Sequence, residues 1–111
     1  MAGFDTINYS VPPKIPIRHG GTVSSNGKIT TSQPNQEVEM QNGEGDDVVV
    51  NALEITNHGA DMNVKMTVAG TDESNYHLIE SGASKVFADI QITKFVVVDN
   101  GSQFSYSGGY Y

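Results

Sequence analysis

Two histidines with nearby carboxylates are the side chains of this sequence that could support acid–base catalysis. His58 is followed three residues later by Asp61, and His77 is preceded by Asp72 and Glu73. A histidine held by a carboxylate can act as a general base, but nucleophilic catalysis also needs a serine, threonine or cysteine beside it. The chain has no cysteine and no Gly-x-Ser-x-Gly elbow, and both histidines lie among turn residues. We therefore expect a protein without enzymatic activity.

An acidic turn carries the oxygen atoms that could hold a metal ion. Glu44, Asp46 and Asp47 lie around two glycines, but their spacing lacks the alternating ligands and the final glutamate of an EF-hand loop. The histidines are too scattered to predict a zinc site, and the Gly-Gly pairs lack the lysine and helix of a phosphate-binding loop. We interpret the turn as solvated and expect no metal and no cofactor.

Three tyrosines near the end of the chain are the most useful candidates for binding. Tyr106, Tyr110 and Tyr111 surround Ser107-Gly108-Gly109. Rigid amphipathic rings beside small residues suit both sugar stacking and protein interfaces. The alternative is that the rings close the edge of the domain or lie at an oligomer contact.

The first 21 residues combine apolar side chains with prolines and are predicted to form an extended N-terminal arm. Prolines at 12, 13 and 16 remove backbone donors and favour extended conformations. A solvated linker would carry fewer aromatic and β-branched residues. The arm therefore either lies on its own domain or contacts a partner. Its candidate contact residues are Phe4, Ile7, Tyr9, Val11, Ile15 and Ile17.

Length, composition and charge limit the class of protein. The 111 residues fit one domain, and 13 acidic against 6 basic residues give a net charge of −7. This charge and the lack of a Lys/Arg cluster argue against nucleic acid and against anionic membranes. No apolar run approaches the roughly 20 residues of a membrane-spanning helix. The first residues lack the pattern of a signal peptide, which predicts synthesis in the cytoplasm.

Short apolar segments separated by turn residues predict an all-β domain over residues 22–111. These segments are 48–55, 64–68, 86–92, 95–98 and 104–106. None shows helical periodicity, and Val and Ile are frequent in them, as is typical of strands. We predict seven or eight short strands in two packed antiparallel sheets, that is, a jelly-roll-like β-sandwich. A small barrel is the alternative.

Turn chemistry predicts three hairpins. Asn26-Gly27 and Asn100-Gly101 suit tight turns between neighbouring strands. The loop 57–61 is expected to join segment 48–55 to segment 62–68. Alternation then predicts one shared inner face, made up of Leu53, Ile55, Val64, Met66 and Val68.

The second half of the chain contains two stretches of strand and turn residues, "ALEITNHGADMNVKMTV" and "YHLIESGASKVFADIQITKFVVVDNGSQFSYSGGYY". Together they resemble small accessory proteins of tailed bacteriophage virions. This resemblance implies a capsid decoration, or cement, protein that binds the assembled phage head. It further implies the major capsid protein or another virion protein as partner, a homo-oligomeric state, and a virion location after synthesis in a bacterial host. The alternative is a carbohydrate- or receptor-binding module of a phage tail or appendage.

Overall fold

The computed structural model describes residues 21–110, and the six apolar residues of the predicted arm lie outside them. The described part is all-β and contains no helix, which confirms the predicted fold class. Its strands form one continuous open antiparallel sheet that folds into a sandwich-like arrangement. The strands are β2 (Gly21–Ser24), β3 (Ile29–Thr30), β4 (Gln36–Glu39), β5 (Val50–Asn57), β6 (Met62–Val68), β7 (Thr71–Asp72), β8 (His77–Ile79), β9 (Ser84–Val97) and β10 (Gln103–Tyr110).

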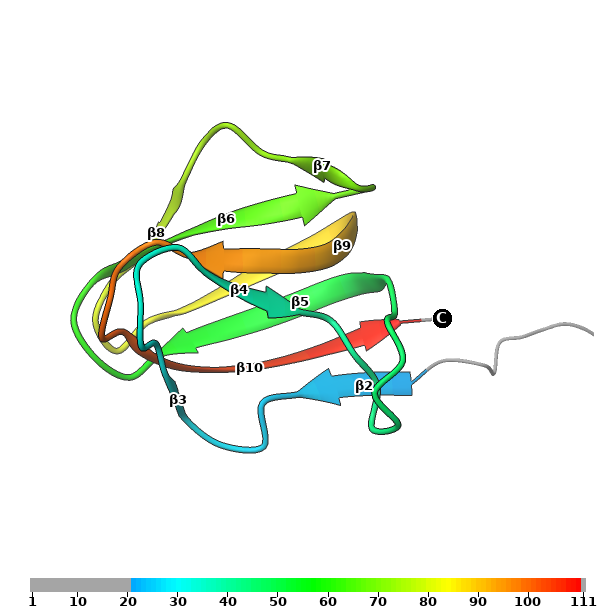
Figure 1. The fold of residues 1–111 in the computed structure, drawn as a ribbon, viewed down its shortest axis with the longest axis horizontal. Helices are drawn as coiled ribbons and strands as arrows, with labels where there is room; N and C mark the ends of the chain where they lie inside the picture. The colour runs from blue at the N-terminus through cyan, green and yellow to red at the C-terminus, as the bar shows by residue number, and fades with distance from the viewer. Residues whose placement is uncertain (1–20, 111) are drawn as a thin grey trace, which may run out of the picture.

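Two layers are joined by the long strand β9 (Figure 1). In the first layer β10 pairs with β2 and β3 on one side and with β5 on the other, and β5 pairs with the first part of β9. In the second layer the last part of β9 lies between β4 and β6, and β6 also pairs with β7 and β8. Ring contacts between Phe95 and Phe104, and between His77 and Phe87, connect the layers.

Strand β9 can serve both layers because it bends. The register with β5 shifts between the pairs Val50–Ile92 and Ala52–Ala88, which leaves extra residues in β9. Within them Asp89 has a φ of 62°, a left-handed conformation that aspartate tolerates better than β-branched residues do. A second shift, opposite Thr67 and Val68, follows a few residues later. Such bulges bend a strand and increase its twist.

The core lies between the layers and is made by alternate residues of the strands. Leu53, Ile55, Val64 and Met66 are buried, as the alternation predicted, and Val68 packs against the core while partly exposed. Phe95 and Phe104 are the largest side chains that are fully buried. Burial of aliphatic and aromatic groups of this size stabilises a fold by roughly 1.5–3 kcal/mol each.

The three predicted hairpins are wrong, although the turns exist. Asn26 and Gly27 do adopt positive φ angles, but β2 and β3 both pair with β10, one after the other, and not with each other. Strands β5 and β6 are separated by β9. Gly101 also turns with positive φ, but β10 leaves β9 and pairs with β5 in the other layer. The turn residues correctly indicated where the chain reverses. They did not indicate which strands become neighbours, because this depends on how the strands are divided between the two layers.

Two buried polar residues fasten the connections between strands. Asn57 is 1% exposed, and its side-chain amide donates to the carbonyl oxygens of Ala60 and Ile79, both at 2.8 Å. Thr31 is 3% exposed, and its hydroxyl donates to the carbonyl oxygen of Asp99 and accepts from the amide of Ser102. Buried polar groups need such partners to offset their desolvation.

Candidate functional site

The outer surface of the first layer consists almost entirely of small side chains. Cross-strand partners lie on the same side of an antiparallel sheet, so the register assembles three rows. They run Thr22–Gly109–Ala52–Ala88, Ser24–Ser107–Glu54–Val86 and Ser105–Thr56–Ser84. All of these residues are exposed or partly exposed. We call these eleven residues the small-residue face, in which Glu54 is the sole charged residue.

The outer surface of the second layer has a different character. Its register brings Glu37, Val96 and Lys65 into one row, and Glu39, Lys94, Thr67 and Asp72 into the next. Lys94 pairs with Glu37 at 3.2 Å, and hydrogen bonding to this carboxylate raises the pKa of Lys94. Thr67 is 5% exposed and donates to Asp72 at 2.7 Å. The other residues of these rows are exposed or partly exposed, as is typical of charged side chains on a solvated surface.

A polar hollow with a volume of about 270 Å³ lies over part of the small-residue face. Hydroxyl groups dominate its lining, and Glu54 contributes a carboxylate. A ligand rich in hydroxyl groups could donate to this carboxylate and exchange hydrogen bonds with the serines. The lining residues are Ser24, Ser25, Gly27, Glu54, Thr56, Ser105, Tyr106 and Ser107.

The tyrosines predicted as binding residues are tied to the core. The ring of Tyr106 packs edge-on against Phe95 at 5.5 Å and is stacked near Phe104, and burial raises the pKa of Tyr106. Tyr110 is half-buried against the core and covers Gly21. Tyr111 lies outside the described residues. The structure therefore packs two of the three rings against the core, although Tyr106 also lines the polar hollow.

The two histidines predicted as candidate bases make different contacts. The Nε2 atom of His58 lies 2.8 Å from the Ser105 hydroxyl, whereas Asp61 instead accepts a hydrogen bond from the amide of Ser81. The serine–histidine pair thus lacks the nearby carboxylate that the sequence suggested. It is an exposed pair on the sheet surface, and no carboxylate of residues 21–110 forms a hydrogen bond with it as the third member of a catalytic triad would.

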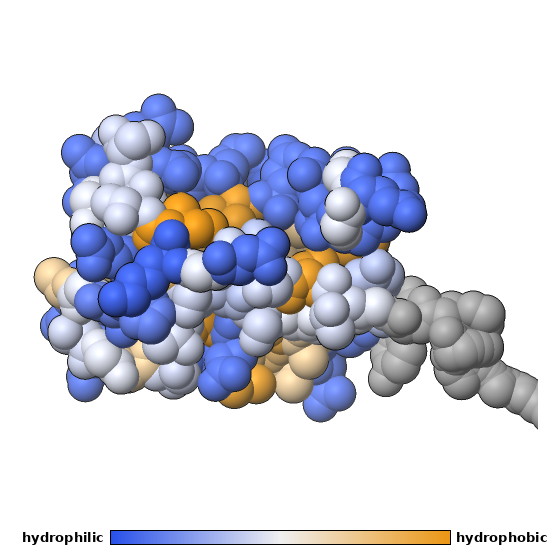
Figure 2. All heavy atoms as spheres, turned by 90° about the horizontal axis from the view of Figure 1, so that it is seen from below, coloured by the Kyte–Doolittle hydropathy of each residue, from blue (hydrophilic) through white to orange (hydrophobic). Residues whose placement is uncertain are grey.

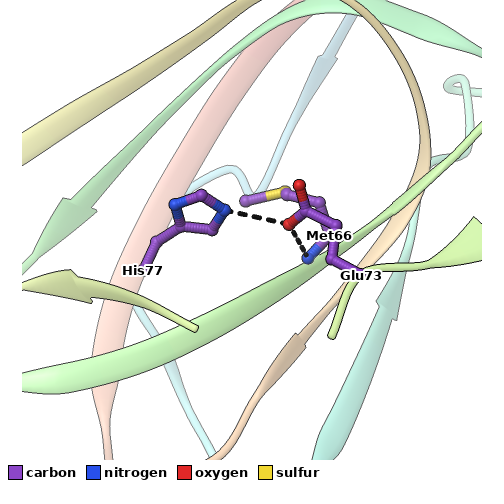
Figure 3. A network of polar contacts seen from close by, with 3 residues as sticks. All are labelled: Met66, Glu73 and His77. Atoms are coloured by element: carbon purple, nitrogen blue, oxygen red, sulfur yellow. Dashed lines mark hydrogen bonds and ion pairs between the residues drawn. The ribbon is translucent and has the colours of Figure 1, made fainter. Parts of the chain in front are cut away.

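His77 and Glu73 form a real pair with a structural role (Figure 3). The Glu73 carboxylate lies 2.9 Å from Nε2 of His77 and accepts from the amide of Met66 at 3.1 Å. The His77 ring also meets Phe87 edge-on at 5.1 Å. These contacts fasten the β7–β8 connection to β6 and to the first layer.

The acidic turn is organised by an asparagine. The side-chain oxygen of Asn42 accepts from the amides of Glu44 and Asp46 at 2.9 and 3.0 Å. Across residues 21–110 no group of three or more His, Asp or Glu side chains is arranged to hold a metal ion. The same residues include no helix able to span a membrane.

A side view of the molecule shows how little apolar surface is presented there. Seen from below the view of Figure 1, hydrophilic side chains cover most of the surface and hydrophobic ones form small patches (Figure 2). The large apolar side chains that are clearly exposed belong to Val49, Tyr76, Leu78 and Val86. Val86 alone of these lies within the small-residue face. Sequence reasoning did not identify that face, because its residues are ordinary individually and only the strand register assembles them.

Comparison with known proteins leaves the family of this chain open. No family model matches the sequence, and no curated protein is similar to it. Two solved structures show a distant likeness of shape. FLHE has a TM-score of 0.42 and 10% identity, over 82% of this chain and 96% of its own. A structure described as a "putative alpha-L-fucosidase" from Bacteroides thetaiotaomicron has a TM-score of 0.39 and 13% identity, over 77% of this chain and 22% of its own.

Proposed function

We propose that this chain is a non-enzymatic structural protein of a tailed-phage particle that decorates the assembled head. The observation that carries the proposal is the contrast between the two outer surfaces. Five charged side chains lie in the two rows of the second layer, whereas the small-residue face has Glu54 alone. Depletion of charge is one part of the compositional signal of the centre of a protein interface.

The small-residue face suits a broad contact with another protein surface. Serine, threonine, alanine and glycine lose little side-chain entropy when they are covered. Their short side chains let two backbones approach closely, so contact can extend over many residues. A subunit that binds only the assembled lattice stabilises that lattice by mass action, in proportion to the logarithm of its concentration over Kd.

The predicted arm supplies a second means of attachment in this proposal. An extended segment such as Phe4–Ile17 can add main-chain hydrogen bonds to an exposed strand edge of a capsid subunit or of a neighbouring copy. The chain itself offers such an edge. Residues 84–88 of β9 pair with β5 on one side, and no strand within residues 21–110 pairs with them on the other.

The test is co-sedimentation of the full chain with assembled empty heads of the phage whose genome encodes it. We expect saturable binding. The substitution Ser107→Arg, which places a large charged residue in the small-residue face, should weaken the affinity for heads by about tenfold or more. The matched control, Thr71→Arg, changes a small exposed residue of β7 and should bind normally. Failure of the unaltered chain to sediment with the heads would refute the proposal.

Sugar binding is a second candidate function, favoured by the hydroxyl-lined hollow. Its test is a glycan array with the full chain and with Glu54→Gln, a substitution of similar size that removes the acceptor charge. A signal that Glu54→Gln abolishes, without any binding to heads, would favour this alternative. The decoration proposal expects no sugar signal.

A further inference from the structure

A groove lined by two valines and by the carboxylates of Glu39 and Asp47, which we call its acidic rim, lies where β4 leads into β5. Its volume is about 260 Å³, and it is lined by Glu39, Asp47, Val48, Val49, Thr93 and Lys94. Val49 is 45% exposed, and Val48 packs partly against the core. An exposed valine beside a half-buried one offers a place for another apolar side chain.

The rim of this groove carries excess negative charge. Lys94 is already paired with Glu37 outside the groove, with 3.2 Å between Nζ and the carboxylate oxygen. Asp47 accepts from the uncharged amide of Gln41 at 3.1 Å. Glu39 is also attracted to Lys94, but this single lysine faces both Glu37 and Glu39, and Asp47 forms no ion pair within residues 21–110. The groove therefore has a net negative charge and suits an apolar segment that carries basic residues.

The strand register places this groove near the point where the chain enters β2. Gly21 is opposite Tyr110, and Gly109 is opposite Ala52, so Gly21 lies about 10 Å from the start of β5, two strand spacings away. Val49 is two residues before Asn51, the β5 position level with Gly21, which puts it roughly 12 Å from Gly21.

We propose that residues Lys14–Arg18 of the same chain occupy this groove. Ile15 and Ile17 then cover Val48 and Val49, and the basic residues at the two ends of the segment face the acidic rim. Six extended residues span roughly 20 Å, so Ile15 reaches Val49 from Gly21. Pro16 restricts Ile15 to extended backbone conformations, which suits a shallow groove.

The distribution of charge along the sequence supports this assignment. Residues 1–20 contain two basic residues and one acidic residue, which leaves four basic and twelve acidic residues in the rest of the chain. Residues 1–20 thus carry a net charge of +1, and the rest of the chain carries −8. With Lys14–Arg18 held on the domain, the part of the arm available to a partner narrows to Phe4–Val11. The inference does not depend on what that partner is.

Disulfide trapping tests the proposal directly, because the chain has no cysteine of its own. The variant Ile15→Cys/Val49→Cys is expected to form an intramolecular disulfide under mild oxidation. The matched control is Ile15→Cys/Val86→Cys. Val86 is 63% exposed and lies about 17 Å from Gly21, across the small-residue face, which is still within the roughly 20 Å that six extended residues span. We expect the first disulfide to form at least tenfold faster than the control.

Charge substitution provides a second readout on the same variant. Adding Glu39→Gln and Asp47→Asn should slow disulfide formation severalfold and remove its dependence on salt, whereas Glu54→Gln should leave the rate unchanged. Equal rates for the Val49 and Val86 pairs, or disulfides that link two chains in place of one, would overturn the proposal.

Discussion

The side-chain amide of Asn57 donates to the carbonyl oxygen of Ile79, 22 residues further along the chain, at 2.8 Å. The same amide binds Ala60, and the side-chain oxygen of Asn57 accepts from Gly59 at 2.8 Å. One buried side chain therefore holds the end of β5, the following turn and the end of β8 together.

Replacement of this residue by alanine should destabilise the fold substantially. Asn57→Ala leaves the buried carbonyl oxygen of Ile79 without this donor, and such a loss costs about 1–3 kcal/mol. Urea unfolding followed by circular dichroism will measure the change. Asn75→Ala, at an exposed loop position, should alter the unfolding free energy by less than about 0.5 kcal/mol. Similar values for both variants would contradict the role assigned to Asn57.

Gly108 should not tolerate a side chain. A Cβ atom there would lie 2.6 Å from the carbonyl oxygen of Ala52 and 2.9 Å from a Val50 methyl carbon. Because β10 is held between β2 and β5, Gly108→Ala must displace backbone and is expected to cost about 1–3 kcal/mol. Thermal unfolding provides the measurement. Gly43→Ala, where nothing lies within 4 Å of an added Cβ, is the control and should unfold near the unaltered temperature.

Asp89 is a position where glycine should stabilise a strand. Its φ of 62° is disfavoured for residues with a Cβ by roughly 1–2 kcal/mol. We therefore expect Asp89→Gly to raise the unfolding free energy by about 1 kcal/mol and Asp89→Val to lower it. Lys85→Gly, an exposed position of the same strand without a positive φ, should have the opposite sign to Asp89→Gly. Chemical denaturation of the three variants compares them, and destabilisation by Asp89→Gly would rule out strain at the bend.

Stability should fall in alkaline solution in a manner that depends on Tyr106. Burial raises the pKa of Tyr106 above its ordinary value of 10.0, so the folded state holds the phenolic proton more tightly than the unfolded state. The contribution of protonated Tyr106 to the unfolding free energy is fully present below pH 10.0 and is lost as pH rises through the folded-state pKa.

The check is the pH dependence of the unfolding free energy in Tyr106→Phe, measured from pH 8 to 11.5. This variant should lose part of the alkaline decline. Tyr76→Phe, at a ring 57% exposed, should retain the decline of the unaltered chain. Identical profiles for all three proteins would contradict the prediction.

The sequence predicted the strands and their inner faces well because these depend on local patterns. Alternation at Leu53 and Ile55, and at Val64 and Met66, reports which side of a strand is buried. It does not report which strand lies alongside. Residues 84–97 looked like parts of two segments, 86–92 and 95–98, because Thr93 and Lys94 separate the apolar residues. The structure shows one bent strand with three long-range partners.

The candidate surfaces were harder to predict for a related reason. Ser107 comes to lie between Ser24 and Glu54 only through the register of three strands. Tyr106 and Tyr110 were chosen for their chemistry, but side-chain type alone does not reveal that both rings turn toward the core. A prediction of such a surface requires the pairing, which distant contacts determine.

The shared strand β9 also determines when the protein can fold during synthesis. Its partners β4, β5 and β6 are all made earlier, yet they do not pair with one another. These segments therefore leave the ribosome with their main pairing edges open. Their pairing with β9 is complete only after residue 97 has emerged. Because β10 completes the first layer later still, most of the pairing between distant strands forms only after residues 84–110 have been made.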